Sequence, residues 1–348
     1  MDYENFKSYI AEHVREHLPE EYAEADISFV KKTKNNGTVR EGMQITKKDA
    51  RMVPVLYINA AYEEYRGGKE MDDVVSGLAD SYIEASLSEK EFRLDMPLEH
   101  INEYDRVKDK IICRLVNREA NEKLLGDKPF TPVEDLAVTY HIQIKSSEDG
   151  IGSIAITEAM MDSYGVDTET LHKQALENME RLSPPVIKPL KEILVEHMLP
   201  EFMASSGLSE EEAKKSLETV IPGTDEGAAP EIICISNRSG INGAACIVSP
   251  EVRQKVADMA GGDYYVLPSS VHEVLAIPKT EDFNCSVLRD MVTGINSSEV
   301  SDEEVLSGSV YEYHAKDRVF CMADSAKRID QPERMQKEGI QKHAVKAH

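Results

Sequence analysis

Residues 231–278 read EIICISNRSGINGAACIVSPEVRQKVADMAGGDYYVLPSSVHEVLAIP, and they carry the clearest alternation of strand and turn signals in the chain. Apolar runs of strand length occur at EIICIS, GAACIVS, YYVLP and EVLAIP, and short polar or glycine-containing segments separate most of them. Ser249 and Pro250 start a helix after the second run, because proline is tolerated at the first helical position. Strands that alternate and are joined by short turns pair antiparallel. The stretch therefore predicts an α+β fold of antiparallel hairpins with packed helices, arranged in two lobes.

The N-terminal α+β lobe is predicted at residues 1–95. Apolar residues fall on one face of a helix over residues 3–17. Asn35-Asn36-Gly37 supplies the positive φ values of a tight hairpin turn between two apolar segments. A third strand over residues 54–58 and helical segments on both sides of Gly67-Gly68 complete the lobe. The predicted order is helix, two or three strands, and two helices.

Residues 96–325 are predicted as one larger α+β region. It begins with a helical pattern over 98–125 and continues with a second hairpin made by LAVTYHIQI and IGSIAIT. A helical insert follows at 186–218, and the proline, glycine and small residues of 219–230 predict a linker. Residues 326–348 carry six Lys and Arg against three acids and little apolar content, which predicts a mobile basic tail.

The composition indicates an acidic globular protein. The 348 residues include 40 Lys and Arg and 64 Asp and Glu, for a formal charge of −24, and 41% are hydrophobic. A phosphate-contacting surface needs clustered Lys and Arg, so direct nucleic-acid binding is not expected. Neither a secretory signal nor an apolar run of membrane-spanning length is apparent, and the five cysteines show no C-x-x-C pair. We expect a cytoplasmic protein without disulfides, cofactor or metal site.

Several longer segments carry a family resemblance. They are EHLPEEY, YINAAYEEYRGGKEMDDVV, RLVNREANEKLL, TETLHKQALEN and the block GAACIVSPEVRQKVADMAGGDYYVLPSSVHEVLAIP. Over nearly the whole chain the sequence resembles the bacterial domain-of-unknown-function family numbered 5688. Residues 136–320 are also similar, more loosely, to the broader family numbered 1444. Neither family has an assigned activity, so the resemblance implies a cytoplasmic bacterial setting and supplies no catalytic residues.

The most concentrated polar cluster is PSSVHE, which lies between two apolar strands and contains Ser270, His272 and Glu273. A serine and a histidine could serve nucleophilic catalysis if a carboxylate oriented the imidazole, but no G-x-S-x-G motif positions this serine. The alternative is a structural turn in which the serines hydrogen-bond local backbone amides. Both interpretations stay open, and the turn is the more ordinary one.

A second candidate is the polar loop NRSGING, in which Arg238 and Asn242 could contact an anion. The loop lacks the G-x-x-x-x-G-K-[ST] spacing of a phosphate-binding loop, so an ordinary hairpin connection is the alternative.

Two functions compete. The absence of a catalytic triad, metal motif or nucleotide loop favours a non-enzymatic interaction or regulatory protein that presents a groove to a protein partner. The alternative is a hydrolase centred on Ser270, His272 and Glu273. Neither the substrate or partner nor the oligomeric state can be predicted from the sequence.

Overall fold

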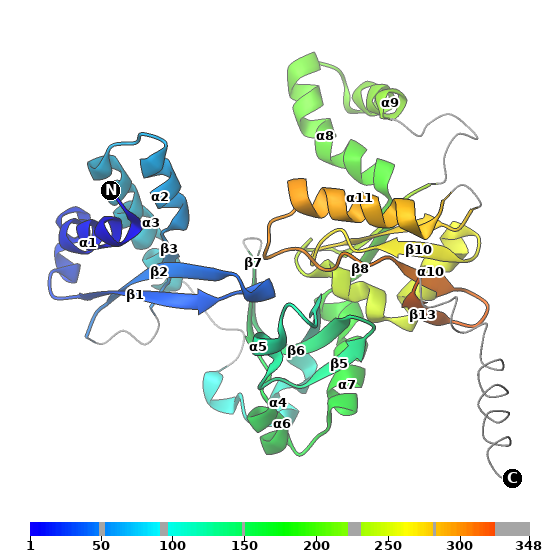
Figure 1. The fold of residues 1–348 in the computed structure, drawn as a ribbon, viewed down its shortest axis with the longest axis horizontal. Coiled ribbons are helices and arrows are strands. Elements are labelled where there is room, and N and C mark those ends of the chain that lie inside the picture. Colours follow the sequence, from blue (N-terminus) through cyan, green and yellow to red (C-terminus); the bar gives the residue numbers. More distant parts are fainter. Residues whose placement is uncertain (49–52, 91–96, 148–149, 222–230, 281–282, 324–348) are drawn as a thin grey trace, which may run out of the picture. The chain divides into compact units, whose positions relative to one another are not determined.

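The computed structural model describes residues 1–48, 53–90, 97–147, 150–221, 231–280 and 283–323. The chain divides into two compact units, Met1–Pro97 and Leu98–His348. Both units combine helices with antiparallel sheets, which confirms the predicted α+β fold class (Figure 1). Most of the predicted linker and all of the predicted basic tail lie outside the described residues.

In the described residues of the first unit, three α-helices accompany a three-stranded sheet in the order β1-β2-β3. Its elements are α1 (Tyr3–His13), β1 (Asp26–Thr33), β2 (Val39–Thr46), β3 (Leu56–Tyr57), α2 (Asn59–Arg66) and α3 (Met71–Lys90). The Asn35-Asn36-Gly37 turn joins β1 to β2, with φ of 58° at Asn36 and 71° at Gly37. These elements follow the predicted order.

The core of the first unit forms between the sheet and the helices. Phe6 and Ile10 of α1 pack with Met43 and Ile45 of β2, and all four side chains are buried. The Tyr82 hydroxyl of α3 donates to the Ile45 carbonyl at 2.8 Å and accepts from the Ile45 N–H at 3.1 Å. Because this tyrosine is buried, the two hydrogen bonds satisfy a group that would otherwise be costly to desolvate.

The second unit contains two antiparallel sheets. In the smaller sheet the order is β4-β6-β5, and β7 also pairs with β6. Its strands are β4 (Ile111–Asn117), β5 (Phe130–Val133), β6 (Leu136–Ser147) and β7 (Gly150–Ala155). Helix α7 (Thr168–Leu182) packs on β4, and its Asn178 amide donates to the carbonyls of Lys108 at 2.7 Å and Ile111 at 2.9 Å. Asp167 caps this helix, as predicted.

The larger sheet has six strands in the order β13-β12-β10-β11-β9-β8. Its strands are β8 (Pro185–Pro189), β9 (Ile233–Asn237), β10 (Tyr264–Leu267), β11 (Val274–Pro278), β12 (Tyr311–His314) and β13 (Val319–Met322). Helix α11 (Cys285–Ser298) buries Leu288 and Val292 against one face. Helix α10 (Pro250–Ala260) lies near the other face, where the Tyr264 hydroxyl donates to the Arg253 carbonyl at 3.1 Å.

The remaining helices are short or stand apart from the sheets. Helices α8 (Leu190–Ser206) and α9 (Glu210–Val220) form a hairpin with its own small core, which contains Val195, Leu217 and Ile221. The predicted capping box of Ser209 and Glu212 starts α9. The short helices are α4 (Tyr104–Val107), α5 (Glu122–Leu125) and α6 (Glu158–Tyr164). Among the described residues, no helix combines the length and the apolar character that crossing a membrane requires.

The helical pattern predicted over 98–125 is wrong in its centre, because residues 111–117 form strand β4. Seven residues of β4 pair with β6, from Ile111 opposite Ile142 to Asn117 opposite Leu136. The apolar residues of this segment fit one face of a helix as well as both faces of a buried strand. Pairing with a strand distant in sequence decides between the two.

The predicted strand GAACIVS is a 3₁₀ helix, η6 (Gly243–Val248), in which all six residues are buried. Strand β11 pairs directly with β9, so the sheet leaves no position for a strand between them. The approach of η6 to the sheet is close, since a Cβ on Gly243 would lie 2.3 Å from the Ser236 hydroxyl oxygen and 2.6 Å from the His272 carbonyl oxygen. Only glycine allows this contact.

The predicted helical insert also begins later in the structure than in the prediction. Residues 185–189 form the edge strand β8, and the helix begins only at Leu190. Pro185 and Pro189 lack a backbone N–H and are therefore tolerated on an edge strand, where one side of the backbone needs no partner.

Candidate functional site

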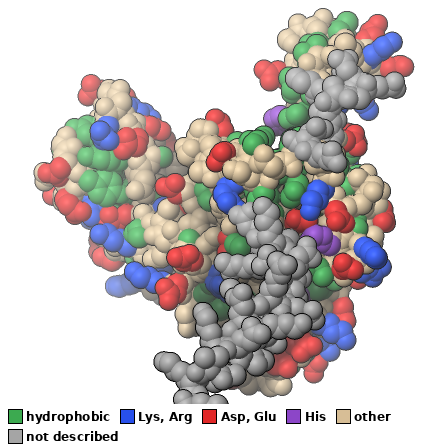
Figure 2. All heavy atoms as spheres, turned by 45° about the vertical axis from the view of Figure 1, so that its right-hand side comes forward, with side chains coloured by type: hydrophobic (Ala, Val, Ile, Leu, Met, Phe, Trp, Pro, Cys, Tyr) green, Lys and Arg blue, Asp and Glu red, His purple; other side chains and the backbone are tan. Residues whose placement is uncertain are grey.

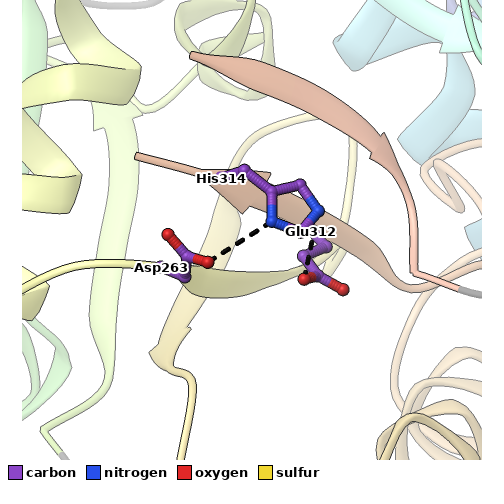
Figure 3. A group of neighbouring side chains, drawn as sticks. All are labelled: Asp263, Glu312 and His314. Carbon is purple, nitrogen blue, oxygen red and sulfur yellow. Dashed lines mark hydrogen bonds and ion pairs between the residues drawn. The ribbon is translucent and has the colours of Figure 1, made fainter. Parts of the chain in front are cut away.

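One end of the six-stranded sheet gathers three potential ligand side chains (Figure 3). Glu312 and His314 are two residues apart on β12, so the pleat places both on one face of the strand. Asp263 directly precedes β10, the neighbour of β12. One donor atom from each of the three side chains can be chosen so that all lie within 4.8 Å of one another. We call these three residues the acid–histidine cluster.

The His314 ring lies between the two carboxylates. Its Nδ1 is 3.3 Å from Asp263 Oδ2, and its Nε2 is 3.2 Å from Glu312 Oε1. The other oxygen of Asp263, Oδ1, accepts from the Ala315 N–H at 2.9 Å. This backbone hydrogen bond orients the Asp263 carboxylate toward the imidazole.

Lys279 supplies a cation to the cluster. Its ammonium is paired with Glu312 Oε1, and it lies 5.5 Å from the centre of the Tyr265 ring. Burial acts to lower the pKa of Lys279, but the hydrogen bond to Glu312 and its charge outweigh that effect, so the pKa is raised. Glu312 is only 3% exposed, so the ammonium compensates a carboxylate that is almost completely removed from water.

The chemistry available to this cluster is that of a cation site. One imidazole nitrogen and two carboxylate oxygens are donors that divalent transition-metal ions accept, and Asp263, Glu312 and His314 are the residues that could hold one. None of these three residues was predicted as a site residue from the sequence. The signal that could have found them is E-Y-H in a predicted strand, since this spacing puts Glu312 and His314 on the same face.

The predicted catalytic candidates form the turn between β10 and β11. The Ser270 hydroxyl donates to Glu273 Oε1 at 2.9 Å and accepts from the backbone N–H of His272 at 3.0 Å. The His272 ring is engaged elsewhere: its Nδ1 accepts from the Asn242 N–H at 3.2 Å, and its Nε2 lies 3.5 Å from Glu304 Oε1. Ser270 therefore contacts Glu273 and the backbone of His272, while the imidazole contacts two residues from other segments.

The two groups of predicted candidates are neighbours, because Asn242 links the NRSGING loop to His272. Asn242 also lines a small cavity of about 20 Å³ together with Asn237, Met179, Ser183 and two cysteines. A cavity of this size has room for roughly one water molecule. Arg238 is exposed and has no ion-pair partner among the residues that the structure describes.

Cys113 and Cys246 are the cysteines of this cavity. Burial raises the pKa of each thiol to about 12. A thiol becomes an effective nucleophile or metal ligand as the thiolate, so both groups are unreactive at neutral pH.

The fold defines a two-unit α+β protein in which helices pack on antiparallel sheets. Over residues 3–315 the chain matches the family described as Family of unknown function (DUF5688), and it belongs to that family. The resemblance to the family numbered 5688 is thereby confirmed, whereas the looser similarity to the family numbered 1444 stays a prediction. No curated protein and no solved structure matches the chain. Because the family description names no activity, the function has to be argued from the residues.

Proposed function

We propose that this chain is a non-enzymatic cytoplasmic binding protein that docks a basic amphipathic helix of a protein partner on helices α8 and α11. The observation that carries the proposal is a stripe of exposed apolar side chains on α11. Val287, Met291 and Ile295 recur every four residues and are 44–49% exposed. We call this stripe, together with Leu194 and Met198 of α8, the docking surface.

Helix α11 carries exposed as well as buried apolar side chains. Leu288 and Val292 bury one side against the sheet, and a helix in that position ordinarily presents polar residues on its outer side. Asp290 and Thr293 follow that rule on the outer side. Val287, Met291 and Ile295 instead flank the buried side along the helix and remain exposed. Exposed apolar side chains that line up along a helix are typical of surfaces that bind another protein.

Helix α8 adds a second apolar strip. Val195 is buried against α9, yet Leu194 and Met198 are 40% and 44% exposed. Figure 1 shows the α8–α9 hairpin and α11 on the same side of the six-stranded sheet, and Figure 2 shows hydrophobic side chains at the surface where the hairpin leaves the body. Methionine is adaptable in shape, which suits a surface that receives a partner helix.

The charge of the hairpin supports a basic partner. Residues 190–220 contain three lysines against seven glutamates, and the whole chain carries −24. A partner with lysines or arginines beside its apolar residues would be attracted by this field and oriented on the docking surface. An acidic helix would be repelled.

We do not extend the proposal to hydrolysis at Ser270, His272 and Glu273. A serine hydrolase needs the serine hydroxyl in contact with the imidazole. In this turn the hydroxyl contacts Glu273, and both ring nitrogens of His272 face other groups.

A titration with a defined peptide tests the proposal. The probe is a fluorescently labelled helical peptide of leucine and lysine, and its counterpart carries glutamate in place of lysine. We expect the full chain to bind the lysine peptide with a micromolar Kd and the glutamate peptide at least tenfold more weakly, with affinity that falls as salt is raised.

Matched variants locate the binding. Leu194→Ser combined with Met291→Ser removes apolar contact without changing charge, and we expect it to weaken binding at least tenfold. Val39→Ser and Val319→Ser also remove exposed apolar side chains, but outside the docking surface, and together they should leave the affinity unchanged. Equal affinity of both double variants would contradict the proposal.

A further inference from the structure

We propose that Asp263, Glu312 and His314 bind a divalent transition-metal ion of the Zn²⁺ class, and that Lys279 is the cation that the ion displaces. This inference is independent of the docking surface. It rests on the donors that the sheet brings together, on their existing orientation and on the position of the competing ammonium.

The backbone places the donors before any ion arrives. Glu312 stands opposite Tyr265 in the antiparallel register between β12 and β10, and Asp263 directly precedes β10. All three potential ligands therefore lie on or beside paired strands, which hold side chains more precisely than loops do. The Ala315 N–H fixes one oxygen of Asp263 and turns the other toward His314. Hydrogen bonds of this kind orient the ligands of known metal centres.

The distances are near those of a filled centre. Donors that share an ion at about 2.1 Å lie roughly 3–4 Å apart. The 3.3 Å contact with Asp263 and the 3.2 Å contact with Glu312 involve different nitrogens of His314, so the separation that applies to a shared ion is the 4.8 Å within which one donor atom of each residue lies. A side-chain rotation that closes the longest separation by about 1 Å completes the site.

Because the two carboxylates approach different ring nitrogens, only one nitrogen can bind the ion. The carboxylate beside the other nitrogen must then turn from the ring toward the ion to serve as a ligand.

The ligand set indicates the kind of ion. An imidazole favours transition-metal ions over Mg²⁺ and Ca²⁺, whereas carboxylates accept both classes. The His314 and Asp263 side chains are 28% and 42% exposed, so the ion can enter from solvent and complete its coordination with water. Cys321 stands opposite Glu312 in the register between β12 and β13, which places a softer donor on the same face of the sheet.

Lys279 sets the affinity. Its ammonium now neutralises Glu312, and an incoming ion would take over that role while pushing the ammonium away. The repulsion between the ion and the ammonium weakens binding, so removal of the ammonium should strengthen it. If the cluster were only an ion pair, neither the natural chain nor a Lys279 variant would bind a metal ion. Titration of both proteins therefore tests the proposal.

The test is a calorimetric titration of the full chain with Zn²⁺ alone, with Co²⁺ absorption as a spectroscopic readout of the ligand set. We expect one equivalent of Zn²⁺ to bind to the acid–histidine cluster and to raise the melting temperature. Lys279→Met should tighten that equivalent about tenfold, and His314→Gln and Asp263→Asn should each weaken it at least tenfold. The metal-induced rise in melting temperature should vanish in the last two variants.

His100→Gln is the matched control, because His100 also lies between two carboxylates, Glu99 at 3.5 Å and Glu103 at 2.7 Å. This variant should leave the titration unchanged. Unaltered Zn²⁺ binding in His314→Gln would overturn the proposal, as would the absence of binding in the natural chain. Zn²⁺ binding by the Lys279→Met variant but not by the natural chain would also overturn the proposal, because the Lys279 ammonium would then be the permanent cation of the cluster.

Discussion

His272 shows how a residue that suggests catalysis can serve the structure of a turn. Its Nδ1 accepts the N–H of Asn242 at 3.2 Å, and its carbonyl accepts the Ser236 hydroxyl at 2.8 Å. The side chain thus connects the β10–β11 turn to the loop that leads into η6.

We expect His272→Ala to lower the free energy of unfolding by about 1–2 kcal/mol, because the Asn242 N–H loses its acceptor. Urea denaturation of the full chain measures this change. Glu304→Ala removes only the partly exposed contact between this carboxylate and Nε2 of the same ring, and should cost less than about 1 kcal/mol. A larger loss from Glu304→Ala than from His272→Ala would refute this account of the turn.

Single residues in the candidate sites were predictable only where they are close in sequence. The polar cluster of Ser270, His272 and Glu273 was visible in the sequence, and so was Asn242. Their connections were not, because the hydrogen bond between Asn242 and His272 spans thirty positions. Asp263 and His314 are still further apart, and only the register of β10 with β12 brings them together.

Between elements, Asp135 links the two sheets of the second unit. It follows β5 in the turn to β6, and its carboxylate accepts from the hydroxyls of Ser307 at 2.8 Å, Ser309 at 3.0 Å and Tyr311 at 2.7 Å. Tyr311 is buried on β12. Burial and then the charge of Asp135 raise the pKa of this tyrosine, so it stays protonated and keeps donating.

Asp135→Ala should lower the free energy of unfolding by about 2–3 kcal/mol, since charge-assisted hydrogen bonds are strong and a buried hydroxyl loses its partner. A double-mutant cycle with Tyr311→Phe, followed by denaturant unfolding, should give a coupling energy of about 1 kcal/mol or more. Additive effects of the two substitutions would mean that the hydrogen bond between Asp135 and Tyr311 contributes nothing to stability.

The smaller sheet should make stability depend on pH through His141 of β6. Burial, and then the charges of Arg114 and Lys128, hold the pKa of His141 well below its ordinary value. In the unfolded chain the same histidine takes up a proton near pH 6.5, so below that pH the unfolded state binds more protons and stability falls.

Between pH 7 and pH 5.5, the unfolding free energy should therefore decrease by up to about 1.4 kcal/mol per pH unit from this group. His141→Gln should show a smaller decrease over the same range, since the carboxylates titrate alike in both proteins. The check is denaturant unfolding of both proteins at several pH values. If their unfolding free energies fall in parallel, His141 is not the source of the pH dependence.

Elements with strong local signals were predictable, and those set by distant pairing were not. The Asn-Gly hairpin, the capped helix at Asp167 and strands β10 and β11 depend on turn and cap residues that are local. The segments 111–117 and 243–248 are apolar, but the spacing of their apolar residues does not distinguish a helix from a strand. Their conformation follows from pairing with β6 and from packing under the sheet, and neither partner is adjacent in sequence.

For the whole molecule, two compact units with separate cores predict separate unfolding events. Phe6→Ala opens a cavity in the first core and should destabilise that unit by about 3–5 kcal/mol. Scanning calorimetry of the full chain should then show one transition moved to lower temperature and the other unchanged. A single transition that moves as a whole would mean that the units unfold together.

A basic helix bound on α8 and α11 should slow amide exchange in these two helices. Hydrogen–deuterium exchange of the full chain, with and without the leucine–lysine peptide, measures this protection. We predict slower exchange in residues 190–206 and 285–298 and no change in the β10–β11 turn at 268–273. Protection confined to that turn, or absent from both helices at saturating peptide, would contradict the proposed binding.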